Sequence, residues 1–215
     1  MKKKISKEEK EKIKQLYSHE ELGPVKNWPL FIYYNICRLF CFFLVGTGAV
    51  LIGIIVEPVL FLLGRKNFKT RARKFVSASF NFFTNLMSFL GCSKYKFFGK
   101  EKLPAARSKI IVANHPSYLD VVYLISAVKN ADCIVRGNLA KSVLAGVVSP
   151  LYILNTSGNE EMLELSKASL KSGANIIVFP EGTRTPRHGT NAFKRGAARI
   201  ALNADADIIP VYIGG

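Results

Sequence analysis

Hydrophobic residues gather in one long apolar stretch near the N-terminus of the chain. Residues 39–56 contain no charged side chain, and the apolar character resumes at Pro58 and continues to Leu63. A helix of that charge-free length would span about 27 Å, close to the roughly 30 Å hydrocarbon core of a bilayer. Because proline disfavours a helix interior, we expect a break or kink at Glu57-Pro58. One membrane span and a bent segment that enters and leaves one leaflet both stay open. A buried helix of a soluble core is disfavoured by the basic residues that follow.

A second helical pattern comes after this apolar stretch. Val76, Phe80, Phe83, Met87 and Leu90 recur at spacings of three and four residues, which places them on one face of a helix. Such a helix can lie in the headgroup plane of a membrane with its aromatic side down. It can equally pack the same stripe against the rest of the protein, and the sequence leaves both interpretations open.

From residue 110 onward, short apolar runs alternate with helical patterns. The expected strands are Ile110–Ala113, Cys133–Arg136, Tyr152–Leu154, Asn175–Phe179 and Ile208–Ile213, and the expected helices are Leu119–Val128, Glu160–Lys171 and Lys194–Asn203. This alternation predicts an α/β fold with a mostly parallel sheet covered by helices, preceded by N-terminal membrane-associated helices. Active sites of such sheets lie in loops beyond the carboxyl ends of strands, and two candidate motifs fall at those positions.

Positive charge is concentrated beside the apolar stretch. The net charge is +16, and residues 64–109 contribute twelve Lys or Arg against only Glu101. Residues 1–27 are rich in Lys and Glu and predict a charged amphipathic helix that ends near Gly23-Pro24. A basic segment directly after an apolar one is typical of a membrane protein bound to an anionic headgroup layer. We therefore expect an anionic membrane surface as a partner, and no nucleic acid.

The four cysteines show no metal-binding or disulfide pattern. Cys37 and Cys41 lie one helical turn apart in apolar sequence, Cys92 and Cys133 are isolated, and no C-x-x-C occurs. This usage predicts a reducing, cytosol-facing environment and no zinc site.

The first candidate motif, Asn114-His115-Pro116-Ser117-Tyr118-Leu119-Asp120, directly follows the first expected strand. Pro116 excludes a continuous helix, and Ser117 is a natural N-cap that would place Asp120 in the first helical turn. Asp120 could then bind one ring nitrogen of His115 and leave the other nitrogen to a substrate, as in a catalytic dyad. The alternative is a capping box in which Asp120 only stabilises the start of the helix.

The second candidate motif, Phe179-Pro180-Glu181-Gly182-Thr183-Arg184, also follows a strand. Proline and glycine favour a rigid turn, while Thr183 and Arg184 offer a hydroxyl and a planar guanidinium that suit a phosphate group. The alternative is a solvated basic loop, which we prefer for Arg187 and Arg195.

Together the two motifs resemble the hallmark of the glycerolipid and lysophospholipid acyltransferase family, typified by 1-acyl-sn-glycerol-3-phosphate acyltransferases. That family carries N-H-x4-D, then a basic residue in a following strand, then F-P-E-G-T-R, then an apolar-Pro-apolar strand. This chain shows all four in order, at Asn114–Asp120, Ile134-Val135-Arg136, Phe179–Arg184 and Ile208–Val211. The resemblance covers about residues 95–215, and the ordered combination is far more specific than either motif alone.

The resemblance implies a role for each matched residue. His115 would be the general base and Asp120 its orienting partner. The substrate-binding group would comprise Arg136, Glu181, Gly182, Thr183 and Arg184, with the two arginines on the acceptor's phosphate. The family often has Lys where this chain has Arg136, which leaves the headgroup preference open.

The resemblance also implies the organisation of the chain. Residues 1–94 would form a basic, apolar, membrane-associated helical region, and residues 95–215 an acyltransferase domain. The family usually continues well past the strand that contains Pro210. Either the C-terminus is shortened here, or the fold closes with fewer elements.

The function implied is that of a membrane-bound O-acyltransferase of phospholipid biosynthesis. An acyl group would pass from a thioester, acyl-CoA or acyl carrier protein, to a lysophosphatidic-acid-like acceptor by His–Asp general-base catalysis, with the active site facing the cytoplasm. No Ser or Cys occupies a nucleophile-elbow motif, so we expect no acyl-enzyme, and neither a metal nor a bound cofactor. Two alternatives stay open: an acyltransferase for a lysolipid without phosphate, such as an amino-acid lipid, and a non-enzymatic binder of anionic lipid.

Overall fold

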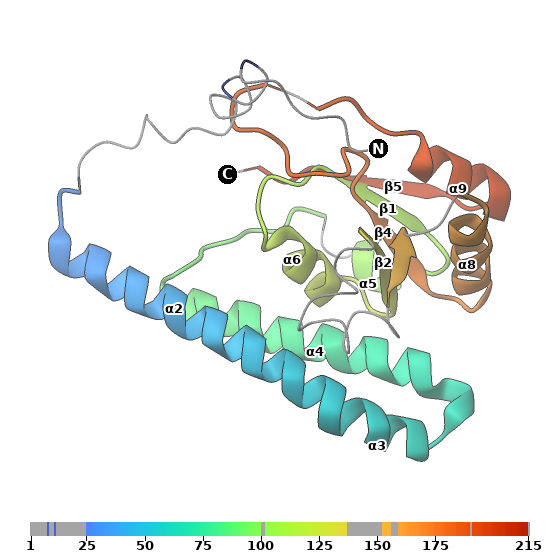
Figure 1. Ribbon diagram of the computed structural model, residues 1–215, viewed down its shortest axis with the longest axis horizontal. Coiled ribbons are helices and arrows are strands. Elements are labelled where there is room, and N and C mark those ends of the chain that lie inside the picture. Colours follow the sequence, from blue (N-terminus) through green and yellow to red (C-terminus); the bar gives the residue numbers. More distant parts are fainter. Residues whose placement is uncertain are drawn as a thin grey trace.

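The described part of the protein combines a parallel sheet covered by helices with a hairpin of two long helices (Figure 1). The computed structural model describes residues 8, 11, 25–99, 102–136, 152–155, 159–189 and 191–214. The amphipathic helix expected in residues 1–27 therefore lies almost wholly outside the described residues.

The sheet contains five strands in the order β3-β2-β4-β1-β5. The strands are β1 Ile110–Ala113, β2 Ala131–Arg136, β3 Ile153–Asn155, β4 Asn175–Val178 and β5 Ile208–Val211. Every neighbouring pair is parallel, so the α/β class and the parallel sheet are confirmed. Pro210 is tolerated because β5 lies at an edge of the sheet, where one side of the strand needs no ladder hydrogen bond.

Helices cover both faces of the sheet. One face carries α4 (Phe68–Phe89), α6 (Asp120–Ala127) and the short α5 (Lys102–Ala105), while the other carries α8 (Asn159–Lys171) and α9 (Gly196–Ala204). The helix expected from Lys194 starts two residues later. The reason is that the Lys194 N–H is bound to the Pro180 carbonyl oxygen at 2.8 Å, within the loop.

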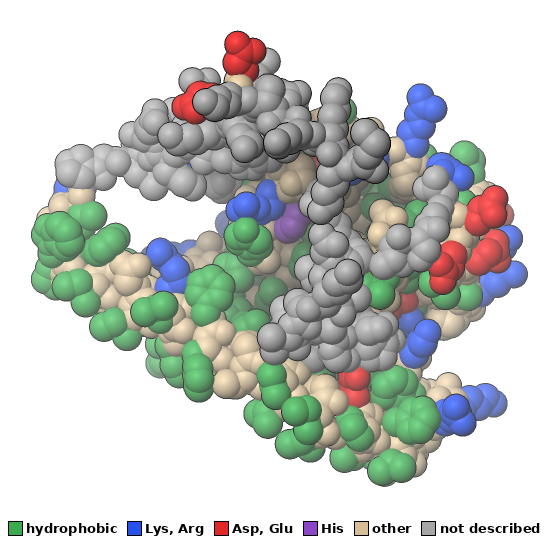
Figure 2. All heavy atoms as spheres, viewed as in Figure 1, with side chains coloured by type: hydrophobic (Ala, Val, Ile, Leu, Met, Phe, Trp, Pro, Cys, Tyr) green, Lys and Arg blue, Asp and Glu red, His purple; other side chains and the backbone are tan. Residues whose placement is uncertain are grey.

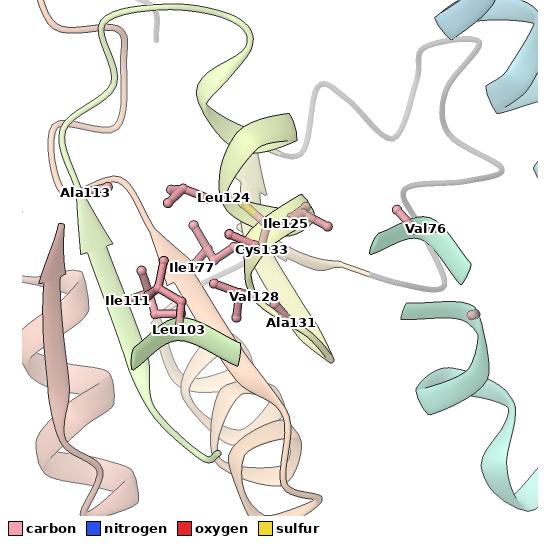
Figure 3. Packing of buried hydrophobic residues seen from close by; sticks show 12 residues of the cluster. Val76, Leu103, Ile111, Ala113, Leu124, Ile125, Val128, Ala131, Cys133 and Ile177 are labelled. Carbon is pink, nitrogen blue, oxygen red and sulfur yellow. The ribbon is translucent and has the colours of Figure 1, made fainter. Parts of the chain in front are cut away.

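The central strands are buried on both faces. Along β1, Ile110 joins the cluster beneath α8 and α9, whereas Ile111 joins the cluster beneath α4 and α6. On β4, Ile176 and Ile177 divide in the same way, and all four isoleucines are fully buried. Figure 3 shows Ile111 and Ile177 packed near Val128 in the cluster beneath α4 and α6. Burying such a side chain stabilises the fold by roughly 1.5–3 kcal/mol, which explains why continuous apolar runs form these strands.

The long apolar helix does not break at Pro58. Helix α2 (Trp28–Leu51), the π-helical turn η1 (Ile52–Val56) and α3 (Glu57–Leu62) form one helix of 35 residues. The break is therefore wrong, whereas the alternative of a kink stays a prediction. The turn before Pro58 is widened, since the Glu57 N–H binds the carbonyl oxygen of Ile52 rather than that of the residue four positions earlier. A wider turn accommodates the proline ring within the helix.

The chain reverses after this helix, at Gly64 and the 3-10 turn η2 (Arg65–Asn67), and α4 returns antiparallel along it. At one end of the hairpin the Tyr33 hydroxyl donates to the Leu90 carbonyl oxygen at 3.0 Å. At the other end the rings of Phe61 and Phe68 meet edge to face, with their centroids 5.8 Å apart.

The apolar stripe of α4 is packed against the protein. Val76 lies in the cluster beneath α4 and α6, together with residues of the sheet. Phe83 and Met87 lie in a separate, smaller cluster with Cys41 of α2. The packing interpretation of the stripe is therefore the one observed. The other side of α4 still exposes aromatic rings, including that of Phe82.

The outer surface of the hairpin is apolar. Within the described residues, one helix, Trp28–Leu62, is long and apolar enough to cross a membrane, and few of its side chains are buried. Hydrophobic side chains line the edge of the molecule along α2 and α3 in Figure 2. Arg65 and Lys66 are exposed at the tip where the chain reverses.

A buried ion pair joins the hairpin to the sheet. Arg73 of α4 binds Asp132 of β2 through two hydrogen bonds, Nε to Oδ1 and Nη2 to Oδ2, each 2.6 Å long. Ser169 of α8 donates a further hydrogen bond to Oδ2. One carboxylate thus links α4, the sheet and α8.

Candidate active site

The two sequence motifs lie side by side at the carboxyl edge of the sheet. Strands β1 and β4 are neighbours, with Val112 opposite Val178, so the loops that follow them emerge together. Two hydrogen bonds connect these loops. The Thr185 N–H donates to the His115 carbonyl oxygen at 2.7 Å, and the His115 N–H donates to Thr185 Oγ1 at 2.9 Å.

His115 and Asp120 form a hydrogen-bonded pair. The distance from His115 Nδ1 to Asp120 Oδ2 is 2.8 Å, and the side chains are 18% and 3% exposed. An ionised carboxylate only accepts hydrogen bonds, so Nδ1 is the nitrogen that donates to it, and in a neutral imidazole Nε2 then carries the lone pair. This arrangement allows Nε2 to act as a base towards a bound hydroxyl.

Asp120 also makes one of the two hydrogen bonds of the capping box that was its alternative interpretation, the bond to the Ser117 N–H. The Ser117 N–H donates to Oδ2 at 2.7 Å, and Ser117 Oγ donates to Oδ1 at 2.6 Å. The helix begins at Asp120 with Leu119 as its cap residue, two positions later than the expected cap at Ser117. A turn at Ser117–Leu119 leads into α6, so one carboxylate serves both the turn and the histidine.

The imidazole ring is held on its face as well as at Nδ1. Phe179, the first residue of the second motif, stacks on His115 with ring centroids 4.3 Å apart and planes inclined by 25°. Stack and hydrogen bond together restrict the ring to one orientation, which is the preorganisation that general-base catalysis needs.

Glu181 organises the second motif from within. Its carboxylate is buried, with the residue 4% exposed, and it accepts hydrogen bonds from the Thr185 hydroxyl and from Asn191 Nδ2, the latter at 2.7 Å. Asn191 Nδ2 also donates to the Arg184 carbonyl oxygen at 2.9 Å. Through Thr185, this network reaches the backbone of His115.

Gly182 turns the chain with a φ of +63°, which lies in the left-handed region. A Cβ at this position would lie 2.6 Å from Lys194 Nζ. Glycine therefore permits both the turn and the close approach of an ammonium group.

The remaining predicted residues lie at the rim or beyond the described part. Thr183 and Arg184 are exposed, and the Arg184 guanidinium carbon lies 4.1 Å from the centroid of the Tyr118 ring. Arg136 ends β2 at the same edge of the sheet, opposite Asn155 of β3, but its side chain lies outside the described part.

Three residues with no assigned role prove to be structural supports of the site. The Asn114 side chain makes two hydrogen bonds to the backbone of Ile213, which lies beyond β5. Its Nδ2 donates to the Ile213 carbonyl oxygen at 2.8 Å, and its Oδ1 accepts from the Ile213 N–H at 2.7 Å. Thr185 and Asn191 are the other two. A hydroxyl directly after the second motif was a usable signal for Thr185, whereas nothing local marks Asn191.

Other reactive groups offer little chemistry in the described structure. Burial raises the pKa of the Cys133 thiol to about 12, so it stays protonated and is a poor nucleophile. In the part of the chain that the structure describes, no three His, Cys, Asp or Glu side chains come together to hold a metal ion.

Comparison with known proteins decides the family. The family model described as Acyltransferase matches residues 94–214, more than half of the chain. The chain belongs to the acyltransferase family. The resemblance expected from the two motifs is thereby confirmed.

Curated relatives of this acyltransferase carry a more specific name. The chain is 31% identical over 126 residues to the chloroplastic 1-acyl-sn-glycerol-3-phosphate acyltransferase LPAT1 of Arabidopsis thaliana, which covers 54% of the chain and 35% of that protein. It is 26% identical over 123 residues to the human 1-acyl-sn-glycerol-3-phosphate acyltransferase alpha, covering 54% of the chain and 44% of the relative. The alignments thus span about a third to a half of the length of these relatives.

A solved structure shares the fold of this acyltransferase. The crystal structure of the 1-acyl-sn-glycerophosphate (LPA) acyltransferase PlsC from Thermotoga maritima matches with a TM-score of 0.59 at 24% identity. The match covers 83% of this chain and 73% of PlsC, so it extends well beyond the length of the family match.

Proposed function

We propose that this acyltransferase moves an acyl group from a thioester to the hydroxyl of a lysophosphatidic-acid-like acceptor, in phospholipid biosynthesis. The observation that carries the proposal is the 2.8 Å contact between His115 Nδ1 and the Asp120 carboxylate, which leaves Nε2 as a base. Relatives named 1-acyl-sn-glycerol-3-phosphate acyltransferases support the acceptor class.

In the proposed mechanism, His115 Nε2 removes the proton of the acceptor hydroxyl while the oxygen attacks the thioester carbonyl. The Asp120 carboxylate stabilises the imidazolium that forms. A backbone N–H of the surrounding loops donates to the oxyanion of the tetrahedral intermediate. Collapse of the intermediate breaks the carbon–sulfur bond, and the thiolate takes the proton from the imidazolium. The products are the acylated lipid and a free thiol, coenzyme A or acyl carrier protein.

The acceptor's phosphate is assigned to Arg184 and Arg136. A guanidinium binds phosphate oxygens through paired N–H donors, and Arg184 lies at the rim of the loop that also holds Glu181. Gly182 and Thr183 line the same loop. The runner-up is a lysolipid without phosphate, such as an amino-acid lipid, which would use the same base but a different headgroup contact.

We also propose that the hairpin holds the enzyme at an anionic membrane surface with its active site facing the cytoplasm. Its exposed apolar side chains would enter the lipid, and Arg65 and Lys66 would meet the headgroups. At that surface the acceptor is concentrated and the acylated product has an apolar environment to enter.

The test is thiol release by the purified protein in detergent, supplied with acyl-CoA or acyl carrier protein thioester and lysophosphatidic acid. His115→Ala should lower turnover roughly 100- to 10,000-fold, the usual contribution of a positioned general base. His188→Ala is the matched control, because His188 is exposed on the loop after the second motif and should be dispensable.

The outcomes separate chemistry from acceptor. Retained turnover in His115→Ala would refute the general-base role. Thiol release with a phosphate-free lysolipid but not with lysophosphatidic acid would leave the general-base role standing and would refute the phosphate headgroup of the acceptor. Thioester consumption independent of any lysolipid would refute acyl transfer altogether.

A further inference from the structure

The rim of the site contains an aromatic ring that no step of the mechanism uses. Tyr118 belongs to the loop after β1 and is 72% exposed, so its ring is not part of the core. The guanidinium carbon of Arg184, from the loop after β4, lies 4.1 Å from the centroid of that ring. The two motifs thus share a further side-chain contact, besides the stacking of Phe179 on His115.

Both partners of this contact belong to the frame that holds the base. Tyr118 directly follows Ser117, whose N–H and hydroxyl are bound to the Asp120 carboxylate. Arg184 directly precedes Thr185, which exchanges two hydrogen bonds with the backbone of His115. The ring and the guanidinium are therefore anchored to the same loops as the catalytic pair.

We propose that Tyr118 is a positioning residue that holds the guanidinium of Arg184 ready for the anionic headgroup of the acceptor. This inference rests on the function proposed above. A ring face attracts a guanidinium through its quadrupole without removing its positive charge. Arginine has a flexible stem with many rotamers, so holding its head in place reduces the entropy lost when the acceptor binds.

This role predicts a split between binding and turnover. Tyr118→Leu removes the ring but keeps an apolar side chain at an exposed position. The KM for lysophosphatidic acid should rise roughly 2- to 5-fold, the equivalent of one exposed cation–π contact. The kcat and the KM for the acyl thioester should stay near wild type, because His115 and Asp120 are untouched. Tyr118→Phe keeps the ring and should behave like the wild type.

A double-variant comparison tests whether Tyr118 acts through Arg184. Wild type, Tyr118→Leu, Arg184→Ala and the double variant are compared by thiol release, with lysophosphatidic acid and with monoacylglycerol as acceptors. In the Arg184→Ala background, Tyr118→Leu should have no further effect on the acceptor KM, because the residue it positions is gone. Thermal unfolding of the four proteins checks that the fold is intact.

The results distinguish this inference from the function on which it rests. An unchanged acceptor KM in Tyr118→Leu, an equal rise in the Arg184→Ala background, or a Tyr118→Phe variant as impaired as Tyr118→Leu would overturn the role of the ring alone. A wild-type enzyme that uses monoacylglycerol as well as lysophosphatidic acid would overturn the proposed acceptor, and the role of Tyr118 with it.

Discussion

The ion pair between Arg73 and Asp132 allows a quantitative test of how the helical hairpin is held to the sheet. Both side chains are 5% exposed, and the guanidinium meets the carboxylate through two hydrogen bonds of 2.6 Å. Arg73 Nη1 also approaches Asn130 Oδ1 at 3.4 Å, and Ser169 binds the carboxylate. Each buried charge thus has the other as its main partner.

Removing one partner should cost much more than removing both. Among the described residues, Arg73→Met leaves the buried carboxylate with Ser169 as its one side-chain donor, and Asp132→Leu leaves the buried guanidinium with the long contact to Asn130. Either change is expected to lower the free energy of unfolding by about 3–5 kcal/mol, the usual result of stranding a buried charge. The double variant places two apolar side chains in contact and should lie within about 1–2 kcal/mol of the wild type.

The measurement is thermal unfolding of the four proteins in the same detergent, followed by circular dichroism. For a chain of this size about 1 kcal/mol corresponds to roughly 2–4 °C, so each single variant should unfold roughly 6–20 °C below the wild type. Losses that add in the double variant would refute the reasoning, because independent sites add and coupled sites do not. Single losses below about 1 kcal/mol would contradict the burial on which the magnitude depends.

Two further predictions concern the loop that supports His115, the proposed base. Thr185→Val keeps the shape but removes the hydroxyl that accepts the His115 N–H and donates to Glu181. It should therefore lose about 1–3 kcal/mol of unfolding free energy and also lower kcat, while Thr185→Ser stays near wild type in melting and thiol-release assays. Gly182→Ala should cost about 1–2 kcal/mol from its left-handed backbone. Lys194→Ala in the same protein should relieve only the additional crowding at Nζ; full recovery of the melting temperature would contradict the backbone explanation.

Several features of the site were predictable from local sequence. His115 and Asp120 stand five positions apart after an apolar run, with Ser117 between them to start a turn, so their pairing needed only short-range geometry. Glu181 and Gly182 likewise follow a strand in a turn that proline and glycine prescribe. Short spacing leaves few backbone conformations, and the residue types decide among them.

Other features could not be predicted, because they join distant segments. Thr185 and His115 are seventy positions apart and meet only because β1 and β4 are neighbours. The partner of Asp132 is on α4, fifty-nine positions away. Tyr118 and Arg184 likewise come into contact because the loops that carry them follow the neighbouring strands β1 and β4.

The sequence by itself determined the class of fold, the strands and the two motifs, because hydrophobic period and turn residues act within a few positions of one another. Only the tertiary structure decided the strand order β3-β2-β4-β1-β5, the continuation of the helix past Pro58 and the packing of the α4 stripe against α6 and α2. All five strands are short and mostly apolar, so neighbours are chosen by how their faces pack with the helices. That choice is a property of the whole core, and it brings the ring of Tyr118, the guanidinium of Arg184 and the imidazole of His115 to one edge of the sheet.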